Sequence, residues 1–279
     1  MRIAVIGSTG MFGSDLLSVL NAKGIECQGL NRQSLNFEQS AEALAESFKE
    51  FDSVVNAVAF TAVDKAEIEI YEANNVNGIY AGLLAQASKI AGARFIHIST
   101  DYVFDGLSST PYKVDEATNP QTAYGKSKAL GEQLVAESRA DYSILRTAWL
   151  YGANGRCFPK VMAELLQKNG SVRVVSDQFG QPTWTHDLAE RVIQVLHLNQ
   201  MPRIVHAVSS GRASWSDFAI EVAKSIGITD EAVEEISTAE YPTPAKRPAW
   251  SVLDNSSDVI TPIGDWRERW RVAAAEVLR

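Results

Sequence analysis

Residues 2–13 read RIAVIGSTGMFG and carry the strongest indication of the fold of the chain. Arg2–Ile6 is a short β-branched run, which predicts a buried strand. Glycines follow at Gly7, Gly10 and Gly13, and apolar residues then recur at helical spacing through Leu20. A strand that leads through a glycine-rich turn into a helix is the first unit of a parallel α/β sheet.

Each glycine of this turn has a distinct task. Gly7 allows a tight turn between strand and helix, Gly10 lets a pyrophosphate approach the backbone, and Gly13 lets the helix pack closely on the sheet. The free N–H groups and the partial positive charge at the helix N-terminus attract phosphates. The glycines are not spaced as GxGxxG, but they stand in the strand-to-helix context that the motif requires. The turn therefore predicts a dinucleotide site.

Strand-like and helix-like segments alternate through the first half of the chain. Short apolar runs predict further strands at residues 25–30, 53–58, 94–99 and 142–147. Helical patterns between them predict helices at residues 41–51, 67–91 and 123–138. In the second of these helices a break is expected near Asn74 and Asn75. Strict alternation with buried strands predicts an α/β fold with a doubly wound, parallel Rossmann sheet.

The pattern loosens after Leu150, which suggests a division of the chain. We expect a Rossmann dinucleotide-binding domain at residues 1–150 and a smaller C-terminal substrate-binding lobe at residues 151–279. No low-complexity linker separates the two parts. Some segments of the second part are therefore expected to return to the main sheet.

Composition excludes several classes of protein. The 279 residues carry a net charge of -8, which does not suit a nucleic-acid backbone or an anionic membrane surface as a partner. The two cysteines, Cys27 and Cys157, do not form a secreted disulfide framework, and they fit a reducing compartment. The histidines show no metal-ligand spacing, so no metal is expected. A strand-like run starts at Arg2 without a signal peptide before it, so the expected location is the cytoplasm.

The end of the second predicted strand bears on the choice of cofactor. An NAD-preferring site usually has an acidic residue at this point, which bonds the ribose hydroxyls. Residues 30–33 read LNRQ and contain no acid. Arg32 could hold a 2′-phosphate through charge-assisted hydrogen bonds, against the plainer interpretation of a solvated loop arginine. We expect NADPH, with NADH left open.

Three functional groups follow the glycine turn along the chain: a hydroxyl, a phenol and an ammonium group. This is the order that a reductase of this fold needs. Thr100 directly follows the fourth predicted strand, and Tyr124 and Lys128 form a YxxxK at the start of a helix. Their i,i+4 spacing puts both side chains on one helical face. The ammonium group would lower the pKa of the phenol, which could then pass a proton to a carbonyl oxygen. The Thr100 hydroxyl could bond the same oxygen as charge develops on it.

Several longer motifs carry a resemblance to a known family. They read NAVAFTAVDKAE at 56–67, STDYVFDG at 99–106, YGKSKALGE at 124–132, RTAWLYG at 146–152, DQFGQPT at 177–183, SWSDF at 214–218 and AKRPAWSVL at 245–253. With these motifs the chain resembles the extended short-chain dehydrogenases/reductases and, among them, the dTDP-4-dehydrorhamnose reductase family. The resemblance spans nearly the whole chain. It implies NADPH-dependent reduction of the C4 ketone of dTDP-4-dehydro-L-rhamnose to dTDP-L-rhamnose.

The resemblance also assigns residues by position. It implies that Thr100, Tyr124 and Lys128 are catalytic, and that Tyr124 and Lys128 also contact the cofactor, Lys128 at the nicotinamide ribose. The cofactor contacts that it implies are Gly10, Met11 and Phe12 for the pyrophosphate, Asn36 and Phe37 for the adenine, and Ala59, Phe60 and Thr61 for the wall of the cleft. The dTDP-sugar contacts that it implies are Val63, Thr100, Asp101, Tyr102 and Trp149. A homodimer is compatible with the resemblance.

Some alternatives stay open at this point. Asn36, Cys157 and Trp250 depart from the family pattern, so a reductase of another nucleotide-linked 4-keto-6-deoxyhexose is an alternative. A dehydratase or epimerase is less well supported, because Asp101 is followed by Tyr102 and not by a second carboxylate. The chain could also be a non-catalytic regulatory subunit, as the β-subunit of methionine adenosyltransferase resembles this family.

Four side chains near the motifs also have a purely structural interpretation. Trp149 could be part of the core. Trp215 could either lie in the core or contact the nucleotide. Asp64 and Lys65 are interpreted as a surface pair.

Overall fold

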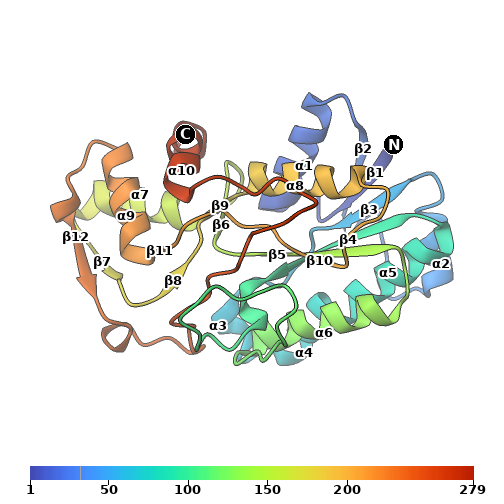
Figure 1. Cartoon of the computed structure of the whole chain (residues 1–279), viewed down its shortest axis with the longest axis horizontal. Coiled ribbons are helices and arrows are strands. Elements are labelled where there is room, and N and C mark those ends of the chain that lie inside the picture. The colour runs from blue at the N-terminus through green and yellow to red at the C-terminus, as the bar shows by residue number, and fades with distance from the viewer. Residues whose placement is uncertain (32) are drawn as a thin grey trace.

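The computed structural model describes residues 1–31 and 33–279. Its centre is a parallel sheet of six strands (Figure 1). In spatial order these are β2 (Glu26–Leu30), β1 (Arg2–Ile6), β3 (Ser53–Asn56), β4 (Arg94–Thr100), β5 (Tyr142–Thr147) and β10 (Ile204–His206). The predicted doubly wound parallel sheet is confirmed. Because β1 lies between β2 and β3, the strand order reverses there, and in such sheets ligands bind outside the carboxyl ends at the reversal.

Both faces of the sheet are covered by helices, which explains why its strands are apolar without alternation. Ile3 and Val5 face α1 (Met11–Ala22) and α8 (Thr185–His197). Ala4 and Ile6 face the opposite layer. That layer consists of α2 (Ala41–Glu46), α5 (Tyr80–Ala91) and α6 (Ala123–Glu137), with α5 and α6 drawn below the sheet in Figure 1.

The helix predicted at residues 67–91 is interrupted. The chain forms α3 (Val63–Ala66), α4 (Ile70–Asn74), a π-helical turn at Asn75–Ile79 and then α5. The side chain of Asn77 in this turn is buried and bonds the backbone of Phe60, accepting from its N–H at 2.8 Å and donating to its carbonyl at 3.1 Å. The π turn thus holds the segment that follows β3.

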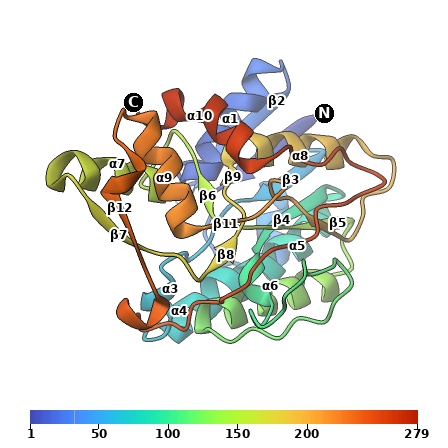
Figure 2. The same cartoon turned by 60° about the vertical axis from the view of Figure 1, so that its left-hand side comes forward.

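The second half of the chain builds a smaller region beside the sheet (Figure 2). Its helices are α7 (Phe158–Asn169), α9 (Trp215–Ser225) and α10 (Trp266–Val277). Short strands pair as β6 (Leu150–Tyr151) with β9 (Thr183–Trp184), β7 (Val172–Val175) with β12 (Val233–Ile236), and β8 (Phe179–Gly180) with β11 (Ala213–Ser214). An aromatic core that includes Tyr151, Phe218, Trp266 and Trp270 holds this region together. By contrast, α8 and β10 of the second half belong to the layers of the main sheet.

Within the described residues, no helix combines the length and the apolar character that crossing a bilayer requires.

Candidate active site

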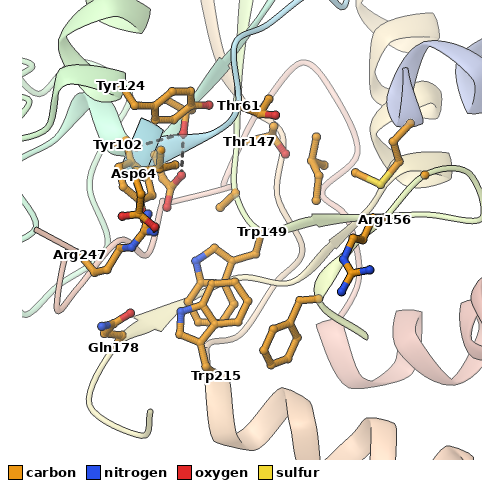
Figure 3. Close-up of a pocket in the computed structure, with 18 of the residues that line it drawn as sticks. Thr61, Asp64, Tyr102, Tyr124, Thr147, Trp149, Arg156, Gln178, Trp215 and Arg247 are labelled. Carbon is orange, nitrogen blue, oxygen red and sulfur yellow. Dashed lines mark hydrogen bonds and ion pairs between the residues drawn. The ribbon is translucent and has the colours of Figure 1, made fainter. Parts of the chain in front are cut away.

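A cavity of about 1130 Å³ opens where the carboxyl ends of the central strands face the smaller region. Ligand pockets usually occupy roughly 300–1,000 Å³, so this cavity has room for more than one small ligand. The predicted site residues that line it are Gly10, Met11, Phe12, Ala59, Thr61, Val63, Thr100, Asp101, Tyr102, Tyr124, Lys128 and Trp149. Residues far apart in the sequence therefore face one space, as Figure 3 shows for Thr61, Tyr124 and Trp149.

The glycine turn has the geometry that a phosphate site needs. Gly7 has φ +82°, a left-handed conformation that glycine adopts without strain, and its carbonyl accepts from the N–H of Gly10 at 3.0 Å. A Cβ on Gly13 would lie 2.2 Å from the Gly7 carbonyl oxygen, so only glycine fits. Gly10 is the N-cap of α1, and among the described residues no side chain caps this end. The residues of this first turn, Gly10, Met11 and Phe12, line the cavity, an arrangement that fits a dinucleotide pyrophosphate.

The segment after β3 forms the next wall of the cavity. Ala59 and Thr61 line it, but Phe60 between them does not. Asn77 holds the backbone of Phe60, and the Phe60 ring packs near Ala66 and Ala73 instead. The Phe60 side chain is thus not among the residues that line this cavity, and its contact with the cofactor stays a prediction.

The remaining residues predicted to contact the cofactor lie outside the cavity lining. Asn36 accepts from the N–H of Glu38 at 2.9 Å, and the ring of Phe37 stacks on Tyr80 with 4.8 Å between centroids. Gly7 and Gly13 form the turn beneath the lining residues. Arg32 lies outside the described residues. The roles of these residues in holding a cofactor stay predictions.

Thr100 and Asp101 stand at the end of β4, where a 3-10 turn (Asp101–Val103) begins. The Thr100 hydroxyl donates to Asp101 Oδ1 at 2.9 Å and accepts from the N–H of Tyr102 at 3.2 Å. Asp101 is buried, and its Oδ2 has no hydrogen-bond partner among the described residues. Burial raises the pKa of Asp101 to about 6, against smaller opposing effects of the Ser251 and Thr100 hydroxyls. Asp101 thus lines the cavity with one carboxylate oxygen that no described residue bonds.

Tyr124 and Lys128, the predicted phenol and ammonium groups, lie near the start of α6. Thr122 caps the helix by accepting from the N–H of Gly125 at 3.0 Å, which orients the turn that carries Tyr124. Burial raises the pKa of Tyr124 far above its usual range, and the Thr100 hydroxyl opposes this in part. Lys128 is not among the groups that shift this pKa in the structure, so the lowering expected from its ammonium group stays a prediction. Tyr124 is consequently protonated at neutral pH.

Lys128 is completely buried, and its ammonium group points toward the main chain of β4. Its Nζ donates to the Ile98 carbonyl at 2.6 Å and lies 3.3 Å from Nε2 of His97. Burial lowers the pKa of Lys128 to about 8, although the nearby Glu132 carboxylate opposes this. Burial also lowers the pKa of His97, with Lys128 adding to the effect, so the imidazole beside the ammonium is neutral. The side-chain amide nitrogen of Asn56 lies 3.2 Å from Nδ1 of His97, so His97 lies between Asn56 and Lys128 and contacts both.

Two indole rings form the wall opposite the catalytic candidates. Trp149 and Trp215 stack with 3.5 Å between centroids and 5° between planes (Figure 3). Trp149 has φ +46°, a left-handed conformation that is costly for a residue with a side chain, and its ring fills the space where Gly180 lacks a Cβ. Both rings line the cavity. The structure thus places Trp149 at the cavity wall, and it adds Trp215, whose position the sequence left undecided.

Replacing Trp149 by alanine is expected to raise KM for the sugar nucleotide that the resemblance implies as substrate by roughly 10–100-fold, because a large stacking surface is lost. The KM for the nicotinamide cofactor should change little, since the glycine turn is untouched. Steady-state kinetics with each substrate varied in turn measure both constants. A loss of folded protein in thermal melts, with no selective effect on either KM, would assign Trp149 to the core alone.

The structure also corrects one interpretation made from neighbouring residues. Asp64 does not pair with Lys65, which bonds Glu69 at 2.9 Å in the i,i+4 manner. Asp64 instead pairs at 2.6 Å with Arg247, which also lines the cavity. Arg156 and Gln178 are further lining residues that the sequence analysis did not select. The family-like motif at residues 245–253 contained the only available signal for Arg247.

Comparisons with known proteins agree with this architecture. The family model described as "RmlD substrate binding domain" matches residues 1–279. The chain is 39% identical over 280 residues to the spore coat polysaccharide biosynthesis protein SpsK of Bacillus subtilis, covering 100% of this chain and 97% of that protein. It is 37% identical to the dTDP-4-dehydrorhamnose reductase of Mycolicibacterium smegmatis, covering 99% of this chain and 86% of that one.

A solved structure gives the same result in three dimensions. It is the dTDP-4-dehydrorhamnose reductase of Bacillus anthracis in complex with NADP, which is 30% identical and superposes with a TM-score of 0.93 over 99% of each chain. Sequence and fold thus agree along the whole length. The chain belongs to the dTDP-4-dehydrorhamnose reductase family.

Proposed function

We propose that this protein is an NADPH-dependent oxidoreductase that reduces the C4 ketone of dTDP-4-dehydro-L-rhamnose to give dTDP-L-rhamnose. One observation carries the proposal. Thr100, Tyr124 and Lys128 face the same cavity as the uncapped N-terminus of α1. A proton donor and a phosphate-binding turn thus share one space, as a reaction between a bound dinucleotide and a carbonyl compound requires.

The cofactor would be held by the first turn of α1 and by the segment after β3. Gly10, Met11 and Phe12 offer backbone to the pyrophosphate, and Ala59 and Thr61 line the adjoining wall. When bound, NADPH supplies the hydride that adds to C4. The proton that completes the alcohol must then come from the protein or from water.

Tyr124 is the residue that we propose as proton donor. Its raised pKa keeps the phenol protonated, which suits donation to the carbonyl oxygen in the direction of reduction. The phenolate left behind is costly in a buried site, and the ammonium of Lys128, one helical turn away, would stabilise it. With a pKa of about 8, Lys128 is largely charged at neutral pH.

Thr100 would orient the carbonyl oxygen. In this structure the Thr100 hydroxyl donates a hydrogen bond to Asp101 Oδ1, with 2.9 Å between the two oxygens. A bond to the substrate oxygen therefore requires the hydroxyl to turn away from that carboxylate. The sugar nucleotide would also meet Val63, Asp101, Tyr102 and the paired indoles of Trp149 and Trp215, which stand on the other side of the cavity.

The experiment is incubation of the protein with NADPH and enzymatically prepared dTDP-4-dehydro-L-rhamnose. Loss of absorbance of the reduced nicotinamide, with dTDP-L-rhamnose as product, is the expected result. Turnover only with a different nucleotide-linked 4-keto-6-deoxyhexose would replace the substrate but keep the reaction class. Absence of turnover with every keto sugar, despite NADPH binding, would favour a regulatory subunit.

The cofactor preference gives a separate prediction. If Arg32 bonds the 2′-phosphate, Arg32→Ala should weaken NADPH binding by about 1.5–3 kcal/mol, the usual contribution of a charged hydrogen bond. NADH lacks this phosphate, so its binding should barely change. Titration of the protein's fluorescence with each cofactor measures both constants. Equal losses for the two cofactors would remove Arg32 from the site.

We place the enzyme in the cytoplasm, in keeping with its cysteine content and with the nucleotide-linked substrates of its relatives. A homodimer stays a prediction of the sequence.

A further inference from the structure

A segment of the C-terminal half spans the side of the cavity near Tyr102. We call residues 245–253 the strap. On one side it bonds β8: the N–H of Phe179 donates to the Ala249 carbonyl at 2.9 Å, and the N–H of Ser251 donates to the Phe179 carbonyl at 2.8 Å. On the other side the indole of Trp250 donates to the Thr110 carbonyl at 2.9 Å. The strap is thus fixed to both the smaller region and the loop after β4.

The strap brings one cation into the cavity. Arg247 Nη2 lies 2.6 Å from Asp64 Oδ2, while Asp64 Oδ1 accepts from the N–H of Ala245 at 3.1 Å. Arg247 Nη1 also reaches the Tyr102 hydroxyl at 3.5 Å. The Arg247 side chain is 20% exposed, and both Asp64 and Arg247 line the cavity. Figure 3 shows Arg247, Asp64 and Tyr102 grouped on the Tyr124 side of the cavity.

This pair offers the chemistry that recognises a hydroxyl group. A guanidinium has several N–H donors in a fixed plane, and beyond the bonds to Asp64 and Tyr102 the described residues offer its other donors no partner. The Asp64 carboxylate supplies acceptors beside them. A hydroxyl can donate to the carboxylate and accept from the guanidinium at once. The two charges neutralise each other, so the pair suits an uncharged sugar ring better than a diphosphate. A partly exposed ion pair also contributes little to stability, which makes a purely structural role a weak explanation.

The distance to the catalytic candidates narrows the choice of hydroxyl. The Tyr102 ring meets Tyr124 edge-on with 5.6 Å between centroids, so Tyr102 stands between Tyr124 and Arg247. For a sugar whose ketone lies at Tyr124, we therefore expect a substituent on a neighbouring carbon to meet Tyr102 and Arg247. In a 4-keto-6-deoxyhexose, C5 carries the ring oxygen and the methyl group. The only hydroxyl next to the ketone is then the one on C3.

We infer that Asp64 and Arg247 form a specificity-determining pair that binds the C3 hydroxyl of the sugar and so positions the C4 ketone at Tyr124. This inference rests on the proposed function. The pair does not touch the reacting atoms. Its contribution is selection of the substrate and orientation of the ring.

The test compares the keto sugar with its 3-deoxy counterpart, both linked to dTDP and both with saturating NADPH. The wild-type protein should prefer the C3-hydroxylated sugar in kcat/KM by about 10–100-fold, the range expected for hydrogen bonds to charged groups. Arg247→Met keeps the apolar stem and removes the donors. It should lower kcat/KM for the hydroxylated sugar by a similar factor, leave the 3-deoxy sugar nearly unchanged and so abolish the preference. Asp64→Asn, which keeps the shape of the side chain, should reduce the preference in the same direction.

Trp250→Phe is the matched control. It removes the indole bond between the strap and Thr110 but leaves Asp64 and Arg247 in place. This variant should retain the preference for the hydroxylated sugar. Thermal melts and NADPH titrations establish that each variant is folded and binds the cofactor. If Arg247→Met does not fold, the preference of Asp64→Asn decides the question.

Three results would overturn the inference. Equal losses for both sugars in the Arg247 and Asp64 variants would mean that the pair only holds the strap. A selective loss of inhibition by dTDP in Arg247→Met would place the guanidinium at the diphosphate. If the wild-type protein had the same kcat/KM for both sugars, the C3 hydroxyl would not be recognised at all. If the wild type turned over neither sugar, the proposed function would fail, and this inference would fail with it. That result differs from one in which the variants turn over both sugars with the wild-type preference, which would overturn this inference alone.

Discussion

Tyr124→Phe is expected to lower kcat by about 10²–10⁴-fold, the usual contribution of general acid catalysis. The substitution deletes one oxygen and keeps the ring, so the contact with Tyr102 should survive. NADPH binding should change little, because the glycine turn lies elsewhere in the cavity. Single-turnover absorbance measurements separate the chemical step from binding. If turnover of a genuine substrate stays near that of the wild type, the proton must come from elsewhere, with Asp101 or Tyr102 as the next candidates.

Lys128→Met gives a companion result with a different signature. It removes the charge that would stabilise the Tyr124 phenolate, so kcat should fall, and NADPH should bind more weakly if the ammonium also contacts the nicotinamide ribose. Burial lowers the pKa of Lys128 to about 8, and the charged form is lost as pH rises through that value. The wild-type rate should therefore decline above about pH 8. That decline should be absent from Lys128→Met. The double variant should be little worse in kcat than Tyr124→Phe, since groups that act as a unit are not additive.

Glu132→Ala is expected to lower the free energy of unfolding by about 3–5 kcal/mol, the usual cost of breaking a buried ion pair. Glu132 and Arg146 are both buried, and the carboxylate accepts two guanidinium hydrogen bonds, at 2.9 and 2.7 Å. It also accepts from the Ser99 hydroxyl at 2.6 Å. The substitution leaves the Arg146 charge buried without its partner. Urea denaturation followed by circular dichroism measures the loss.

The double variant Glu132→Leu with Arg146→Met is the control for this prediction. It removes both charges and keeps most of the volume, so it should cost much less than Glu132→Ala. A single variant that is no worse than the double one would show that the pair contributes little and that the site tolerates an unpaired charge.

The fold and the two main motifs were predictable because their signals are local. The turn through Gly7, Gly10 and Gly13 depends on backbone geometry within a few residues, and the i,i+4 spacing of Tyr124 and Lys128 depends on one helical turn. The parallel sheet follows from alternation of short apolar runs with helical patterns, and six paired strands confirm it. Family-like motifs added residues at other positions, such as Trp149 and Asp101.

Features that depend on burial could not be derived from the same patterns. The spacing of Tyr124 and Lys128 predicted a lowered phenol pKa, but the pKa is raised because segments from across the chain enclose the ring. In the same way, the interruption at Asn75–Ile79 was expected only as a break. Its form follows from the contact that Asn77 makes with Phe60, 17 residues earlier.

Patterns among neighbours along the chain are enough to predict the strand-turn-helix unit at the N-terminus, the order of the catalytic candidates and the layered α/β class. Which charges meet depends instead on how distant segments pack together. Asp64 has Lys65 beside it in the sequence, yet it pairs with Arg247, 183 residues away. The strap is fixed to β8 and to the loop after β4, and this carries the guanidinium to the carboxylate. Likewise, Trp149 and Trp215 stack because two distant segments meet at the cavity wall, a contact that no local pattern encodes.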